Sequence, residues 1–244
     1  MSRRWFPAAY RRPRGRAFAV LLYLGLLAGI LIARRAAASS GLDATDVTVA
    51  AVLLVAPALL GSRLLFAVLH LDVVRREPSR ILQPAGTGAA LYGALLAALA
   101  TSVPLLHVLH VPIGAFWDAA AVAMLVALIP GRIGCLLNGC CSGRASDSIL
   151  AIELADHAGV RRRRLPVQLF EAAWAAVLLV WTGLVWDDRP FDGSVFLLVL
   201  AAYAAARLVF EPMRESSDRI GEINVQQAIS AVLVLLSIAG LLAG

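Results

Sequence analysis

The chain has 244 residues, of which 60% are hydrophobic, and its mean hydropathy is +0.80. Soluble domains are closer to half apolar, so this composition excludes a soluble globular protein and indicates an integral membrane protein. The formal net charge is +6, and every basic residue apart from histidine is arginine. Because the arginines gather at the ends of apolar runs, we expect them to meet anionic lipid headgroups and not nucleic acid.

Seven apolar segments approach the length of about 20 residues that a membrane span needs. The first has no distinctive cleavage motif, so we expect it to be retained as a span. The sequence therefore predicts an all-α integral membrane protein with about seven transmembrane helices. A basic tail, residues 1–16, precedes a single polytopic membrane domain, residues 17–244. The expected spans are roughly Ala17–Ala33, Val47–His70, Gly86–His107, Val111–Pro130, Val167–Trp186, Ser194–Phe210 and Val225–Leu242.

The longest stretch between spans, residues 131–166, is expected to form a small extramembrane head between spans four and five. It begins with the run GRIGCLLNGCCSGR, residues 131–144, which holds all three cysteines of the chain. A membrane protein that gathers this much polar chemistry at the end of one span is most simply interpreted as building a site there. Further along the loop, polar and apolar residues alternate weakly over residues 148–155, a pattern that favours either a short strand or a surface helix.

Arginines interrupt two of the predicted spans. Arg63 lies deep in the second, and Arg207 lies near the end of the sixth. A charge in the bilayer core costs at least about 2.5–3.5 kcal/mol, so each must be paired or must face a polar cavity. Tyr203, Arg207, Glu211 and Arg214 share one helix face by their spacing. They form either a structural ion pair at a helix end or a polar stripe lining a cavity for an anion.

Two other span starts carry polar residues. The third opens on a glycine-rich segment, residues 86–88, followed by Tyr92. Glycines at a helix start expose N–H groups that suit an anion, although small residues also simply pack membrane helices. The fifth opens at Pro166, and Gln168 and Glu171 lie about one turn apart on one face. These two residues either complement the helix dipole or belong to a site.

The three cysteines allow four interpretations, because one is always left over from any disulfide. They are small residues in a packed turn, a redox or disulfide pair of Cys135 with Cys140, a nucleophile that carries an acyl or lipid group, or a metal site. Metal binding is the least favoured, since zinc usually takes four ligands and only His157 lies nearby in sequence. We therefore assign no metal and no cofactor.

Taken in order, these motifs resemble the phosphatidylglycerol–prolipoprotein diacylglyceryl transferase family, whose members are seven-span bacterial enzymes. The family signature, roughly GRxGNFxNxExxGR, is similar to residues 131–144, where the glycines, both arginines and Asn138 match. The resemblance extends to three further motifs, which are the Gly-x-Arg ending at Arg63, the Pro-x-Gln-Leu-x-Glu of residues 166–171, and the stripe of Tyr203, Arg207, Glu211 and Arg214.

The chain also departs from the family pattern, and three of the departures bear on the chemistry. Tyr92 stands where the family has the histidine of a His-Gly-Gly motif. Within the signature, Cys135 replaces an asparagine and Cys140 replaces the glutamate. The sequence therefore resembles the scaffold and the anion site of the family more than its complete catalytic set.

The resemblance implies that diacylglyceryl passes from phosphatidylglycerol to the lipobox cysteine of an exported prolipoprotein, whose signal peptide is the second partner, in the bacterial plasma membrane. A substrate thiolate then displaces glycerol phosphate from the lipid. The candidate catalytic residues are Arg132, Arg207, Tyr92 and Cys140. The candidate substrate-binding residues are Arg63, Asn138, Arg144, Gln168, Glu171, Tyr203, Glu211 and Arg214.

Two alternatives remain open from the sequence. One is a protein of the same fold that uses Cys135 or Cys140 for transferase or redox chemistry of its own. The other is an inactive protein that binds phospholipid. Two signals for the membrane orientation also conflict. Six arginines before the first span favour a cytoplasmic N-terminus, against the orientation of the family. The family orientation, with the site on the outer side, is the one we expect.

Overall fold

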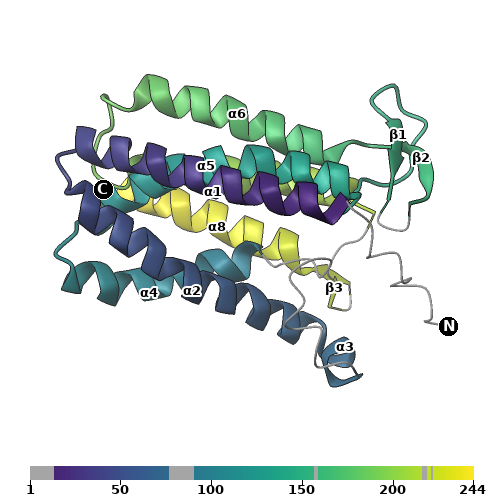
Figure 1. The fold of residues 1–244 in the computed structure, drawn as a ribbon, viewed down its shortest axis with the longest axis horizontal. Coiled ribbons are helices and arrows are strands. Elements are labelled where there is room, and N and C mark those ends of the chain that lie inside the picture. The colour runs from purple at the N-terminus through teal and green to yellow at the C-terminus, as the bar shows by residue number, and fades with distance from the viewer. Residues whose placement is uncertain (1–13, 77–90, 157–158, 216–218, 221) are drawn as a thin grey trace.

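The computed structural model describes residues 14–76, 91–156, 159–215, 219–220 and 222–244. In this part of the chain the long helices lie side by side, and short strands gather at one end of the bundle (Figure 1). The long helices are α1 (Arg14–Ser39), α2 (Ala44–Leu69), α4 (Leu91–Val108), α5 (Ile113–Asn138), α6 (Val167–Val185), α7 (Ser194–Phe210) and α8 (Val225–Ala243).

Six of these helices are long and apolar enough to cross a membrane, which supports a multi-pass membrane protein. The remaining one, α4, is apolar but shorter. Its predicted span began at Gly86, within residues 77–90, which lie outside the described part of the chain. The count of seven spans therefore stays a prediction.

The fourth predicted span differs from the structure at its end. We expected the span to end at Pro130 and the head to begin at residue 131, but α5 continues to Asn138 with Pro130 inside it. Proline removes one backbone hydrogen bond, a defect that membrane helices tolerate. The helix ends instead at Gly139, whose φ of 73° is left-handed and whose N–H bonds back to carbonyls of the last turn. The first half of the signature is therefore helical.

The loop after α5 contains an antiparallel hairpin of β1 (Ile152–Ala155) and β2 (Arg161–Arg164), in which Ile152 pairs with Arg164. The strand alternative for residues 148–155 is thus the one that the structure adopts. Isolated bridges join Gly143 to Arg214 and Ala145 to Arg164. The loop is therefore held against the segment that follows α7, which contains the 3-10 helix Glu211–Met213.

Two aspartates, the buried Asp118 and the exposed Asp43, cap helices at the opposite end of the bundle. The carboxylate of Asp118, on α5, accepts hydrogen bonds of 2.8 Å from the N–H groups of Gly193 and Phe196, which begin α7. Asp43 accepts in the same way from Thr45 and Asp46 at the start of α2, and these N–H groups lower the pKa of Asp43. Such caps satisfy backbone donors that a membrane would leave unpaired.

Three further elements complete the fold. They are the short helix α3 (Leu71–Arg76), which follows α2, and the strands β3 (Arg219–Ile220) and β4 (Ile223–Asn224), which lead into α8. Contacts between helices place α5 near the centre, against α1, α6 and α7, while α2 packs on α4 and α7 on α8. α5 therefore ends, and α6 and α8 begin, at the end of the bundle that carries the strands (Figure 1).

The contact between α2 and α4 depends on two glycines. A methyl group at Gly61 would collide with the carbonyl oxygen of Gly93 and with the Cβ of Ala97. Gly61→Ala is expected to destabilise the protein by about 1–3 kcal/mol, because the helix backbones must separate. Gly183→Ala is the matched control, since a Cβ there meets nothing within 4 Å in the described residues. Thermal unfolding in detergent checks the pair, and an equal midpoint for both variants would contradict this packing.

Candidate functional site

Five charged side chains from three parts of the chain converge at the strand-bearing end of the bundle. Arg132 comes from α5, Glu171 from α6, Arg207 from α7, and Glu211 and Arg214 from the 3-10 helix and the residue after it. We call this set the arginine–glutamate cluster. Measured by a helix rise of 1.5 Å per residue, the three helical members lie about 5–9 Å inside the helix ends. That depth is close to the headgroup boundary of a bilayer.

Glu171 is the centre of the cluster and is 0% exposed. Its Oε2 lies 2.6 Å from Nε of Arg132, and its Oε1 lies 2.7 Å from Nη1 of Arg207. Glu211 continues the chain of charges, with Oε2 2.6 Å from Nη2 of Arg207 and 3.6 Å from Nη1 of Arg214. Each carboxylate therefore bridges two guanidinium groups.

The cluster keeps a positive surplus after this pairing. Three guanidinium groups face two carboxylates, which leaves one positive charge in a largely buried place. Two guanidinium donors, Nε of Arg207 and Nε of Arg214, are buried and have no hydrogen-bond partner among the described residues. Buried donors without partners are uncommon in folded proteins. A positive surplus with spare donors is an arrangement that can bind an anion.

Two tyrosines lie beside the arginines of the cluster. Nη2 of Arg132 donates to the hydroxyl of Tyr203, over 3.2 Å. The Cζ of Arg207 lies 6.0 Å from the centre of the Tyr92 ring, at the limit of a cation–π contact. The start of α4 thus brings Tyr92, only 2% exposed, against the same arginine that pairs with Glu171.

The hydroxyl of Tyr92 is committed to a hydrogen-bonded chain. It lies in contact with Oγ of Ser230 on α8, and Ser230 donates to the carbonyl of Gln226 over 2.7 Å. A serine hydroxyl carries one proton, so Ser230 must accept from Tyr92. The phenol is therefore fixed as a donor. Ser230 was missed by the sequence analysis, because a lone serine in an apolar span gives no signal.

The loop after α5 closes over the cluster. Gln168, 1% exposed, donates from Nε2 to the carbonyl of Cys140 over 2.8 Å. The backbone N–H of Arg144 donates to the carbonyl of Met213 over 2.8 Å, while the Arg144 side chain is exposed. The loop therefore contacts both the start of α6 and the end of α7.

Two candidate residues remain at the margin of the site. Asn138 is the last residue of α5 and is half-buried beside Cys140. Arg63 is half-buried on α2, the helix that packs on α4. The structure thus gathers eight candidate residues, which are Arg132, Tyr92, Gln168, Glu171, Tyr203, Arg207, Glu211 and Arg214. Asn138 ends α5, Arg144 lies in the loop that follows it, and Arg63 lies on α2.

Arg164 is a second residue that the sequence did not single out. It belongs to a run of four arginines, yet it is 1% exposed. Its Nη2 lies 2.9 Å from Asp156 and its Nη1 lies 2.6 Å from Glu215. Arg164 therefore braces the hairpin against the segment after α7. Position within a charge run could not distinguish this residue from its exposed neighbours.

The three cysteines come together beside the cluster as free thiols. Their Sγ atoms all lie within 4.8 Å of one another. Cys141 has a φ of 56°, a left-handed conformation that is uncommon for a residue other than glycine. The neighbouring Cys135 and Cys140 thiols, together with the positive charges of Arg214 and Arg132, hold the pKa of Cys141 below its usual range despite burial.

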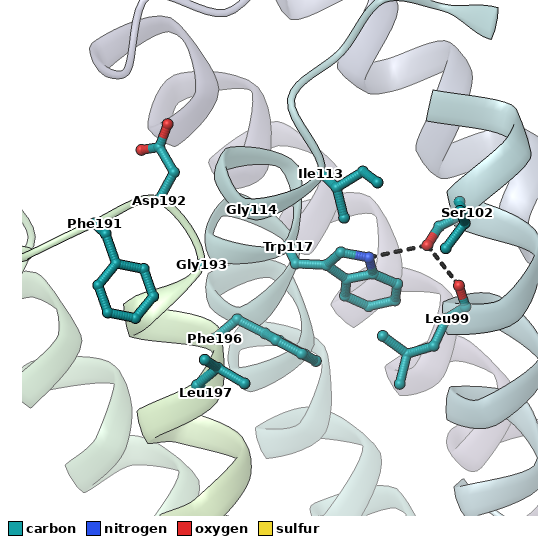
Figure 2. A pocket seen from close by; sticks show the side chains of 11 residues that line it. Leu99, Ser102, Ile113, Gly114, Trp117, Phe191, Asp192, Gly193, Phe196 and Leu197 are labelled. Carbon is teal, nitrogen blue, oxygen red and sulfur yellow. Dashed lines mark hydrogen bonds between the residues drawn. The ribbon is translucent and has the colours of Figure 1, made fainter. Parts of the chain in front are cut away.

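A separate apolar pocket of about 240 Å³ lies at the other end of the bundle (Figure 2). The ring of Trp117 lines it, and the Trp117 Nε1 donates to Oγ of Ser102 over 3.0 Å. The lining comes from α4, the start of α5 and the start of α7. None of the candidate site residues line this pocket.

The central carboxylate gives a stability prediction. Glu171→Gln is expected to destabilise the protein by about 3–5 kcal/mol, because Arg132 and Arg207 lose the charge that balances them in a buried site. Glu153→Gln is the matched control, since Glu153 is exposed on β1. Chemical or thermal unfolding in detergent measures both variants. Equal stability of the two would mean that Glu171 does not hold the cluster together.

Comparison with known proteins bears on the whole chain. The family model for prolipoprotein diacylglyceryl transferase matches residues 13–243. Three relatives named phosphatidylglycerol–prolipoprotein diacylglyceryl transferase are similar over most of their length. The protein from Dehalococcoides mccartyi is 25% identical over 225 residues, which cover 91% of this chain and 86% of the relative. That from Clostridioides difficile is 24% identical over 218 residues, with 89% and 86% covered. That from Streptococcus pyogenes is 26% identical over 233 residues, with 91% and 87% covered.

The family match confirms the resemblance drawn from the motifs. It includes every helix that contributes a side chain to the arginine–glutamate cluster. The chain belongs to the prolipoprotein diacylglyceryl transferase family.

Proposed function

We propose that this protein transfers diacylglyceryl from phosphatidylglycerol to the lipobox cysteine of an exported prolipoprotein. The single membrane domain, residues 17–244, would do so in the bacterial plasma membrane. The observation that carries the proposal is the arginine–glutamate cluster, with its positive surplus and its spare buried donors at headgroup depth. The proposed substrates are those that the names of the relatives give.

The cluster supports a role in stabilising the leaving phosphate. In the reaction, the sulfur of the acceptor attacks a glycerol carbon, an S–C bond forms, and the C–O bond breaks with its electron pair on the phosphate oxygen. Arg207 and Arg214 would donate to the phosphate through their spare Nε groups, with Arg132 beside them. Charge-assisted bonds from preorganised donors in a water-poor site stabilise such developing charge.

The other candidate residues fit around this task. Glu171 and Glu211 orient the guanidinium groups, and Tyr203 fixes Arg132. Gln168 holds the loop closed through the carbonyl of Cys140. Arg63, Asn138 and Arg144 are proposed to contact the headgroup from the margin of the site.

Tyr92 is proposed to position Arg207 and not to take a proton. Its hydroxyl donates into the Ser230 chain, and its ring lies against the guanidinium group. A free thiol has a pKa of about 8.5, so the acceptor needs only modest help to ionise beside arginines. Replacement of the family histidine by tyrosine is therefore compatible with transfer.

A turnover assay tests the function. The purified protein is given phosphatidylglycerol and a lipobox peptide, and the peptide mass is measured. Wild type is expected to add a diacylglyceryl group. Arg132→Ala and Arg207→Ala are expected to lower the rate by about 10²–10³-fold, because donors to the developing charge are lost. Arg162→Ala, at an exposed position on β2, is the matched control and should leave the rate unchanged.

Absence of any mass shift with wild type, while phosphatidylglycerol still binds, would contradict transfer and favour the binding-only alternative.

Tyr92→Phe separates the two roles of that residue. The variant keeps the ring against Arg207 and is expected to retain most of the activity. Loss of activity as large as that of Arg207→Ala would mean that the hydroxyl takes part in proton transfer.

The orientation has its own test. Gly244 lies at the end of the bundle opposite the strands and the cluster (Figure 1). Since the acceptor is an exported protein, the cluster is proposed to face outward, which places Gly244 in the cytoplasm. A reporter enzyme that is active only in the cytoplasm is therefore expected to be active when it is fused after Gly244. A reporter active outside the membrane would contradict this orientation.

A further inference from the structure

The three cysteines carry chemistry that the arginine–glutamate cluster does not use. They occupy residues 135, 140 and 141, a spacing that fits no common zinc motif in sequence. The turn at Gly139 and the left-handed Cys141 fold the chain back, and the three Sγ atoms lie within 4.8 Å of one another. Two of the three stand at positions where the family signature has an asparagine and a glutamate.

The sulfur geometry is close to that of a metal site. Zinc–sulfur bonds of about 2.3 Å in a tetrahedron place neighbouring sulfurs about 3.8 Å apart. The three Sγ atoms already lie within 4.8 Å of one another and are free thiols. Closing onto a metal thus needs movements of about 1 Å or less for each side chain. Among the described residues, this is the one group of three or more cysteine, histidine or acidic side chains so close together.

The surrounding charge also suits a thiolate site. Three thiolates with one divalent cation carry a single negative charge. Arg132 lies one helical turn before Cys135 on α5, and Arg214 is bridged to Gly143, two residues after Cys141. Both arginines lie near Cys141, where a neighbouring guanidinium group favours a thiolate over a thiol.

We propose that Cys135, Cys140 and Cys141 bind one zinc ion with three thiolate ligands, beside the arginine–glutamate cluster. A tetrahedral zinc with three protein ligands keeps its fourth position for an exogenous ligand, as catalytic zinc sites do. Thiolate ligands select soft or borderline metals such as zinc over magnesium and calcium.

The role of the metal rests on the proposed function. The acceptor thiol takes the fourth position, a Zn–S bond forms, and the proton leaves to water. The sulfur then attacks the glycerol carbon with its electron pair, and the C–O bond breaks toward the phosphate. The zinc thus performs the deprotonation that Tyr92, held as a donor, does not perform.

Metal analysis tests the site without any activity. The full chain is purified in detergent with an affinity tag that contains no histidine. Its zinc content is measured by inductively coupled plasma mass spectrometry. Wild type is expected to hold about one zinc per chain. Cys140→Ser and Cys141→Ser are expected to lose it, whereas Ser142→Ala, in the same loop, should keep it. Exchange to Co²⁺ should give a sulfur-to-cobalt charge-transfer band in wild type and in Ser142→Ala only.

A second measurement covers the case in which the cysteine variants do not fold. Titration of wild type with a mercurial thiol reagent is expected to release zinc in step with the reacted thiols. Wild type without zinc, zinc retained in the cysteine variants, or a disulfide or lipid adduct on any of the three cysteines would overturn the site. Diacylglyceryl transfer by metal-free protein would overturn the role and leave the proposed function standing. Zinc binding without transfer would contradict the proposed function and leave the zinc site standing.

Discussion

The pairing of Glu171 with two arginines is the interaction on which the rest of the site depends. A guanidinium group inside a membrane bundle is costly, and two of them side by side repel each other. A fully buried carboxylate that contacts both, at 2.6 and 2.7 Å, makes their approach possible. α5, α6 and α7 must meet at this one point for the charges to balance. The requirement ties the packing of three helices to the chemistry at their ends, and the Arg164 brace holds the loop over them.

The same constraint explains how the site can differ from its family without losing its scaffold. By the resemblance of the motifs, Cys135, Cys140 and Tyr92 are expected to depart from the family pattern, whereas the five cluster residues are expected to match it. The phosphate-binding and proton-handling parts of the reaction are therefore separable. We propose that the arginines keep the first and that the second has passed from a histidine to a zinc-bound thiolate.

Much of this site could be predicted from the sequence, because its spacing lies within single helices. The stripe from Tyr203 to Arg214 and the turn from Gln168 to Glu171 were recognised as shared faces, and both face the cluster. The family assignment followed from the same motifs and is confirmed.

What could not be predicted depends on contacts between distant segments. Ser230 contacts Tyr92 across 138 residues, Arg164 pairs with Glu215, and the three thiols approach one another around two residues, Gly139 and Cys141, in left-handed conformations. The extent of α5 was also missed, since Pro130 looks like a helix end in sequence but is accommodated within the bundle.

The central claim is that the arginine–glutamate cluster binds the phosphate of the lipid. An experimental structure of the protein with phosphatidylglycerol, determined in detergent or in a lipid disc, tests it most directly. The account predicts the phosphate group within hydrogen-bonding distance of Arg207 and Arg214, beside Arg132, with Glu171 still bridging the two helices. A phosphate bound elsewhere, for example at the apolar pocket around Trp117 or on the exposed arginines of the hairpin, with the cluster closed on itself, would contradict it.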